Sequence, residues 1–135
     1  METFTLDNDI KVLCVTATSF PEGITEAHQN LHALVPYSNN RRYFGMSHPK
    51  EKGVIIYNAA AEELNQNEAG LLGCETLIIK SGTYISTTIK DYLKDISSIG
   101  KAFQILLSQK GLDREGYCVE WYLNNKDVRC MIRLK

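Results

Sequence analysis

The order of strand-like and helix-like segments repeats along the chain, and this repetition constrains the fold more than any single motif. Each half contains a strand-like run, an amphipathic helix pattern and then two more strand-like runs. Apolar residues recur every three or four positions in "SFPEGITEAHQNLHALVP" and again in "DISSIGKAFQILLSQKG". The two helix patterns begin roughly 75 residues apart, about half of the chain, while the halves share little sequence.

This order predicts an α+β fold built from a duplicated strand-helix-strand-strand module. We expect one domain over residues 1–135, with repeat 1 at about 8–63 and repeat 2 at about 74–135. Each repeat would form an antiparallel sheet half with a helix on one face, and a ligand cleft would lie between the halves. Residues 64–74 are interpreted as a connector. The pattern argues against a Rossmann fold, because it contains no helix-linked parallel strands and no Gly-rich phosphate loop.

Local signals predict where several elements begin and end. Ser19 followed by Glu22 matches a capping box at the start of the first helix, and Asp95 is predicted as the N-cap of the second. Ser81 and Gly82 bend "ETLIIKSGTYISTTI" into two strand pieces. The turn sequence "NNKD" joins "YCVEWYL" and "VRCMIRLK" into a C-terminal hairpin.

Composition and charge narrow the class of protein. With 44% hydrophobic and 23% charged residues, the chain can form a packed core. The net charge of −1 and the scattered basic residues argue against direct binding of nucleic acid. No apolar run approaches the roughly 20 residues of a membrane span, and the polar N-terminus does not match a signal peptide. Four cysteines without C-x-x-C spacing predict a reduced, cytoplasmic protein with no metal site and no cofactor.

Glu120 is the one charged residue inside the apolar strand "YCVEWYL". Strand alternation places Val119, Trp121 and Leu123 on one face, predicted to pack on the helices, and Glu120 with Tyr122 on the other. A buried carboxylate needs a partner, or its pKa rises until it is neutral.

The partner of Glu120 depends on the register of the C-terminal hairpin. With "NNKD" as the loop, Trp121 would lie opposite Cys130, and Glu120 would share its face with Arg129 and Arg133. Two alternatives therefore stay open: Glu120 forms an ion pair with one of these arginines, or it faces a ligand. Neutralisation by arginine would favour neutral or anionic ligands.

The first predicted hairpin also has two distinct faces. One face is apolar and carries Phe44, Met46, Val54 and Ile56. The other carries Tyr43, Gly45, Ser47, Ile55, Tyr57 and Ala59. We expect the face with tyrosines to point away from the helices and to line an amphipathic cleft, because small-molecule sites combine aromatic walls with a few polar groups.

Six residues are candidates for ligand binding. They are Glu120, Tyr122, Tyr43, Tyr57, Tyr84 and Trp121. Alternatives are ordinary sheet-surface positions for the tyrosines and core positions for Tyr84 and Trp121. His28 and His32 share a helix face without a third metal ligand in a recognisable motif. No catalytic residue is assigned, except Glu120 as a general base if the protein is a hydrolase.

The segments that carry these features also occur in a characteristic order. They are "SFPEGITEAHQNLHAL", "RYFGMSHPKEKGVIIYNAAAEE", "SGTYIS" and "GYCVEWYL". Their order and spacing resemble the GyrI-like small-molecule-binding domains, which include the effector-binding domains of multidrug-responsive bacterial transcription activators. The resemblance implies that Glu120 is the carboxylate of a ligand pocket and that Tyr122, Tyr43 and Tyr57 lie in it.

The resemblance also implies a set of functions. The leading hypothesis is a stand-alone domain that binds an aromatic and possibly cationic small molecule, with a regulator or enzyme as a partner in trans. Regulators of the family carry an N-terminal helix-turn-helix domain, whereas this sequence starts in a strand-like segment, so no direct DNA binding is expected. The alternatives are a small hydrolase of reactive natural products and an inhibitor-type module that binds another protein.

Overall fold

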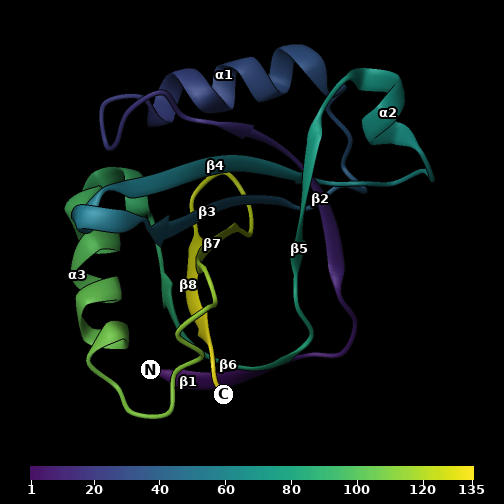
Figure 1. Cartoon of the computed structure of the whole chain (residues 1–135). Helices are drawn as coiled ribbons and strands as arrows, with labels where there is room; N and C mark the ends of the chain where they lie inside the picture. The colour runs from purple at the N-terminus through teal and green to yellow at the C-terminus, as the bar shows by residue number, and fades with distance from the viewer.

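The computed structural model describes residues 1–135 as one antiparallel sheet with helices on its outer side (Figure 1). The strands are β1 (Glu2–Leu6), β2 (Ile10–Thr16), β3 (Tyr43–Pro49), β4 (Ile55–Glu62), β5 (Glu75–Ile79), β6 (Gly82–Ile89), β7 (Cys118–Tyr122) and β8 (Val128–Arg133). The α-helices are α1 (Ile24–Leu34), α2 (Glu68–Leu72) and α3 (Ser97–Leu107), and short 3-10 turns lie at Glu51–Gly53 and Tyr92–Lys94. The α+β class is therefore confirmed.

All eight strands belong to a single curled sheet with the order β1-β6-β8-β7-β3-β4-β2-β5. The sequence predicted two sheet halves with a cleft between them. Instead, β3 from the first half pairs directly with β7 from the second, with Gly45 opposite Glu120. The two predicted halves are thus continuous through the centre of the sheet.

The inner side of the curl is filled by apolar side chains from every strand. This core includes Phe44, Met46, Val119 and Met131, all nearly inaccessible to water. Helices α1 and α3 lie outside the curl, α1 against β2 and β4 and α3 against β6 and β8 (Figure 1). Each helix closes its own smaller apolar cluster.

The helices cover the opposite sheet face from the one predicted. Tyr43, Tyr122 and Cys118 pack into the helix-side clusters, whereas Val119 and Trp121 pack on the inner side. The predicted grouping of residues in the first hairpin is confirmed, since Gly45 and Ser47 lie opposite Ala59 and Tyr57 and so share a face with them. The residues of β3, β4 and β7 were therefore sorted correctly into two faces, but the assignment of these faces to the helix side and the open side was wrong.

The predicted register of the C-terminal hairpin is also wrong by one residue. Tyr122 lies opposite Val128, so the loop contains five residues instead of four. The Asn124 side chain stabilises this longer loop, because its Oδ1 accepts the backbone N–H groups of Lys126 (2.7 Å) and Asp127 (2.9 Å).

The register moves the arginines away from Glu120. Glu120 lies opposite Cys130, so neighbouring Arg129 is on the inner face, where its guanidinium stacks on Phe4 at 4.3 Å. Arg133 donates to the Asp113 carboxylate at 3.1 Å. Neither arginine is the partner of Glu120.

Two element boundaries differ from the sequence predictions. Helix α1 begins at Ile24 with no side-chain cap, so Ser19 and Glu22 do not form the predicted capping box. Helix α3 begins at Ser97, and Asp95 accepts from its hydroxyl at 2.5 Å without being the N-cap. Strand β1 was not predicted. No helix has the length and apolarity needed to cross a membrane.

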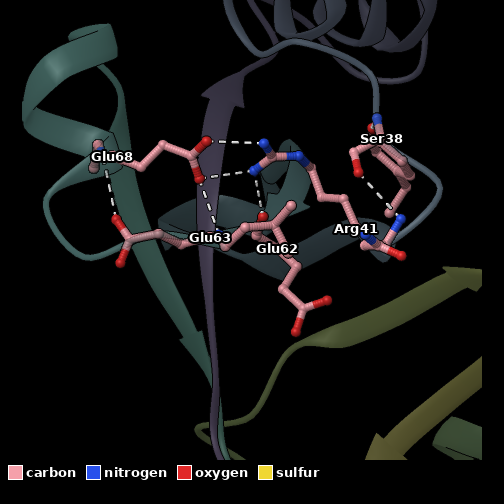
Figure 2. Close-up of polar contacts among 9 residues, drawn as sticks. Ser38, Arg41, Glu62, Glu63 and Glu68 are labelled. Carbon is pink, nitrogen blue, oxygen red and sulfur yellow. Dashed lines mark hydrogen bonds and ion pairs between the residues drawn. The ribbon is translucent and has the colours of Figure 1, made fainter.

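The predicted connector contains helix α2, which is held by a buried arginine. Arg41 donates from Nη1 and Nη2 to the two carboxylate oxygens of Glu68, each at 2.8 Å, and from Nη1 to the Glu62 carbonyl at 2.7 Å (Figure 2). Glu63 accepts the backbone N–H of Ala69 at 3.1 Å. These bonds fix α2 to the end of β4.

Candidate functional site

A cavity of about 1440 Å³ lies between α1 and α3 on the outer face of the sheet. Its floor comes from the paired central strands β3 and β7, which present Tyr43, Ser47, Cys118, Glu120 and Tyr122. The walls are mostly apolar and aromatic. They include Phe20, Ile24, Tyr37, Tyr92, Ile96, Ile99, Phe103 and Leu107.

Glu120 is held at the floor by two tyrosine hydroxyls. Tyr122 donates to Glu120 Oε1 at 2.5 Å, and Tyr57 donates to the same oxygen over a longer 3.4 Å. The hydroxyls of Tyr57 and Tyr122 are 3.2 Å apart. Gly45 makes this arrangement possible, because a Cβ there would lie 2.1 Å from the Tyr57 hydroxyl and 3.0 Å from Glu120 Oε1.

The second carboxylate oxygen of Glu120 is available to the cavity. Oε2 accepts no hydrogen bond, yet it is not among the buried polar atoms that lack a partner. No lysine, arginine or histidine forms a salt bridge with this carboxylate, which is the only one that lines the cavity. Burial raises the pKa of Glu120 above its ordinary value, while the hydroxyls of Tyr122 and Tyr57 oppose the rise.

His28 extends the hydrogen-bonded group from the floor to helix α1. Its Nε2 lies 2.8 Å from the Tyr57 hydroxyl, and its ring meets the rings of Tyr57 and Tyr122 edge-on at 5.8 and 5.5 Å. Burial lowers the pKa of His28 to about 4, with a smaller effect from His32. His28 is therefore neutral at pH 7 and does not compensate the charge of Glu120.

The low pKa of His28 predicts a pH-dependent stability. In the unfolded chain His28 binds a proton near its ordinary pKa of 6.5, whereas in the folded chain it does so only near 4. The stability that neutral His28 supports is therefore present above pH 6.5 and is lost as the pH falls toward 4. In His28→Gln, the loss of unfolding free energy between pH 7 and about pH 4.5 should be smaller than in the wild type by about 2 kcal/mol.

Urea denaturation at both pH values measures this difference. The control is His48→Gln, because His48 lies on β3 beside Tyr117 and does not line the cavity. An equal pH dependence in the wild type and His28→Gln would contradict the assignment of His28 as a buried neutral group.

Aromatic rings surround Glu120 on more than one side. Phe20 stacks on Tyr57 with ring centroids 6.1 Å apart, and Tyr92 lies 6.0 Å from Tyr122. Phe20 remains 41% exposed, so its ring offers a face to the cavity. A charged or aromatic ligand at Glu120 would therefore contact rings as well as the carboxylate.

The structure brings four of the six candidate residues together. Glu120, Tyr122 and Tyr43 line the cavity, and Tyr57 lies beneath them with its hydroxyl on Glu120. Trp121 is on the inner face, with its ring 5.7 Å from the rings of Phe4 and Phe44.

Tyr84 also lies on the inner face, away from the cavity. It donates to the Lys80 carbonyl at 2.6 Å, and burial raises its pKa to about 12. Tyr84 and Trp121 thus occupy the core positions that were their alternative interpretation.

Several cavity residues were not among the sequence candidates. They include Phe20, His28, Tyr37, Tyr92 and Phe103. Phe20 and Tyr92 lie in turns outside the regular strands, where no alternation marks a face. Phe103 was assigned to the apolar stripe of its helix. The spacing of His28 and His32 placed both on one face of α1, and this signal could have indicated that the face borders a site.

Comparison with solved structures identifies the fold. The structure of SAV2435 bound to tetraphenylphosphonium matches with a TM-score of 0.73 and 10% identity, covering 99% of this chain and 93% of the other. An integron cassette protein from the mobile metagenome of Vibrio cholerae matches with a TM-score of 0.67 and 12% identity, covering 99% and 95%. The C-terminal domain of EcmrR matches with a TM-score of 0.65 and 11% identity, covering 99% and 96%.

These likenesses concern the fold, since the sequences differ at about nine positions in ten. No family model and no curated protein matches the chain. The fold is thus one that occurs in a protein solved with a lipophilic cation and in the C-terminal domain of EcmrR.

Proposed function

We propose that this protein binds a lipophilic aromatic cation in the cavity between α1 and α3, with Glu120 as the counter-charge. One observation carries the proposal: Glu120 presents a free carboxylate oxygen to an aromatic cavity, and no cationic side chain is paired with it. A carboxylate in such surroundings is costly unless it is neutral or meets a positive charge.

Charge attraction to Glu120 and cation–π contact with the aromatic walls both favour a cation over a neutral ligand of the same shape. A unit charge 4 Å from Glu120 would gain about 4 kcal/mol at an effective dielectric constant near 20. Contact with aromatic rings such as Phe20 and Tyr92 would add about 0.5–2 kcal/mol. The raised pKa of Glu120 reduces the gain at low pH, because the cation must then displace a proton.

The biological role that fits this site is that of an effector-binding or sequestering domain. We infer that the chain is a GyrI-like domain formed by duplication, acting as a small-molecule sensor in the cytoplasm without binding DNA itself. The strand order supports duplication, since it reads the same from both ends when β1 to β4 are exchanged with β5 to β8. The shared fold of SAV2435 and the EcmrR C-terminal domain supports the relation to effector-binding domains.

Tetraphenylphosphonium is the probe that tests this function. At a concentration of about 100 times its Kd, it should raise the Tm of the wild type by about 5 °C or more. Glu120→Gln keeps the shape of the side chain and removes its charge, so we expect at least a tenfold loss of affinity by calorimetry. Glu115→Gln is the matched control, because Glu115 is exposed and outside the cavity. Equal affinity of the wild type and Glu120→Gln for tetraphenylphosphonium would contradict the proposal.

A hydrolase is the second candidate, favoured by the raised pKa of Glu120. A carboxylate whose pKa is closer to neutrality is a better general base toward a water beside a bound electrophile. Turnover of a reactive electrophile, lost in Glu120→Gln and kept in Glu115→Gln, would support this candidate. The inhibitor-type role stays a prediction.

A further inference from the structure

The Tyr57 hydroxyl is the point where helix α1 meets the charged group of the cavity. It lies over Gly45, where β3 carries no side chain, and so reaches from β4 to Glu120 on β7. Its oxygen is 3.4 Å from Glu120 Oε1, 3.2 Å from the Tyr122 hydroxyl and 2.8 Å from His28 Nε2. Because Tyr57 is 1% exposed, its hydroxyl depends on these three neighbours for hydrogen bonds.

The Tyr57 hydroxyl has a single proton to donate to these neighbours. An ionised carboxylate accepts more strongly than a neutral oxygen or nitrogen, so with Glu120 ionised the proton points to Oε1. Tyr122 donates to the same oxygen at 2.5 Å, so Oε1 accepts two hydroxyls and Oε2 stays available to the cavity. The Tyr57 oxygen is then an acceptor, and His28 Nε2 is the nearest of its three neighbours.

The opposite direction of these hydrogen bonds leaves Glu120 with fewer donors. With the ring proton of His28 on Nδ1, the bare Nε2 would take the Tyr57 proton, and Glu120 would keep only the Tyr122 hydroxyl. The tautomer of His28 therefore decides whether Oε1 receives two donors or one. Burial already raises the pKa of Glu120, so the loss of one donor makes its ionised form still more costly.

We propose that His28 is a positioning residue for charge selectivity: its Nε2–H donates to Tyr57, which commits the Tyr57 proton to Glu120 Oε1 and keeps the carboxylate ionised toward a cationic ligand. The inference rests on the proposed function and adds a residue of the helical wall that controls the same site. His28 acts through Tyr57 and without a charge of its own, because it is neutral at pH 7. Hydrogen bonds in such a chain strengthen one another.

Two probes that differ in charge test this role. Methyltriphenylphosphonium and triphenylphosphine oxide share three phenyl rings, so the ratio of their affinities measures charge selectivity. By calorimetry at pH 7, His28→Leu should lower the affinity for the cation about fivefold and change that for the neutral probe less than about twofold. His28→Gln should recover most of the cation affinity, because glutamine offers a donor nitrogen in place of Nε2.

The matched control is His32→Leu. His32 lines the same wall of the cavity and contacts the Tyr43 ring, but its side chain makes no hydrogen bond within the chain. Whatever its effect on either affinity, this variant should keep the ratio of the wild type.

Two further measurements separate positioning from a change of cavity shape. If His28 acts through Tyr57, the double variant His28→Leu/Tyr57→Phe should bind the cation no more weakly than Tyr57→Phe alone. Nitrogen NMR of the histidine rings in the wild-type complex should show His28 protonated at Nε2 and bare at Nδ1, with His28→Gln assigning the signals.

Four results would each overturn the inference while the cation site stands. They are an unchanged cation affinity in His28→Leu, an equal fall in the affinity for both probes, additive losses in the double variant, and a proton on Nδ1 of His28 in the complex. If neither methyltriphenylphosphonium nor tetraphenylphosphonium binds the wild type, the proposed function fails and the inference fails with it.

Discussion

Replacing Arg41 with methionine is expected to lower the free energy of unfolding by about 3 kcal/mol. Arg41 is 7% exposed and makes two charge-assisted bonds to Glu68 and one to the Glu62 carbonyl (Figure 2). Methionine fills a similar volume but leaves the Glu68 carboxylate and that carbonyl without their main donor. Removing one partner of a buried ion pair costs several kcal/mol, because the remaining charge is uncompensated.

The pH dependence of Arg41→Met gives a second measurement. Hydrogen bonding to Arg41 lowers the pKa of Glu68 from its ordinary 4.5 to about 2. A depressed carboxyl pKa contributes stability above pH 4.5, and this contribution is lost as the pH falls toward 2. The difference between wild type and Arg41→Met should therefore shrink in acid. Arg114→Met, at an exposed position, is the control for urea denaturation. Equal stability of wild type and Arg41→Met at pH 7 would refute the role of Arg41 as the anchor of α2.

Gly45→Ala is expected to disrupt the floor of the cavity. The added Cβ would lie 2.1 Å from the Tyr57 hydroxyl oxygen and 2.8 Å from its ring carbon Cζ. Tyr57 is 1% exposed, so its ring has little space to retreat, and overpacking of this kind costs about 1–3 kcal/mol. Displacement of Tyr57 would also move Glu120, so we expect affinity for tetraphenylphosphonium to fall at least tenfold.

Two further variants test whether the effect of Gly45→Ala comes from the clash with Tyr57 or from replacing a glycine with alanine as such. Gly70→Ala adds the same methyl group within α2, where no atom lies within 4 Å, and should be neutral or slightly stabilising. Tyr57→Phe in the Gly45→Ala background removes the atom in closest contact and should recover part of the lost stability. Gly45→Ala could instead unfold at the same urea concentration as the wild type and bind tetraphenylphosphonium equally well. In that case, the close contact between Gly45 and Tyr57 does not determine the position of Tyr57 and Glu120.

Strand alternation was sufficient to predict part of the site. It placed Glu120 and Tyr122 on one face of their strand and Tyr43 with Tyr57 on one face of the first hairpin, as the structure has them. Alternation is reliable here because neighbouring side chains of a strand must point to opposite sides.

The choice of which face the helices cover could not be predicted in the same way. The inner side of the curled sheet forms a core of its own, so Phe44 and Val119 are buried without a helix over them. Apolar residues therefore mark a buried face, but they do not say whether a helix or another part of the sheet buries it. The register of the last hairpin could not be predicted either, because the hydrogen bonds of the Asn124 side chain within its five-residue loop are not visible in an apolar pattern.

The remaining walls of the cavity depend on contacts between distant parts of the chain. Phe20 meets Tyr57, and His28 meets Tyr122, across separations that no local spacing encodes. Burial also sets the pKa of His28 and Glu120, and burial follows only from the packed structure.

The central pairing of β3 with β7 means that neither half of the chain contains a complete floor, since Gly45 and Glu120 come from opposite sides of the 64–74 segment. A chain cut in the exposed stretch Asn65–Asn67 would carry one part of the site on each fragment. Ligand occupancy and fragment association would then be thermodynamically linked, so that a ligand would draw the fragments together.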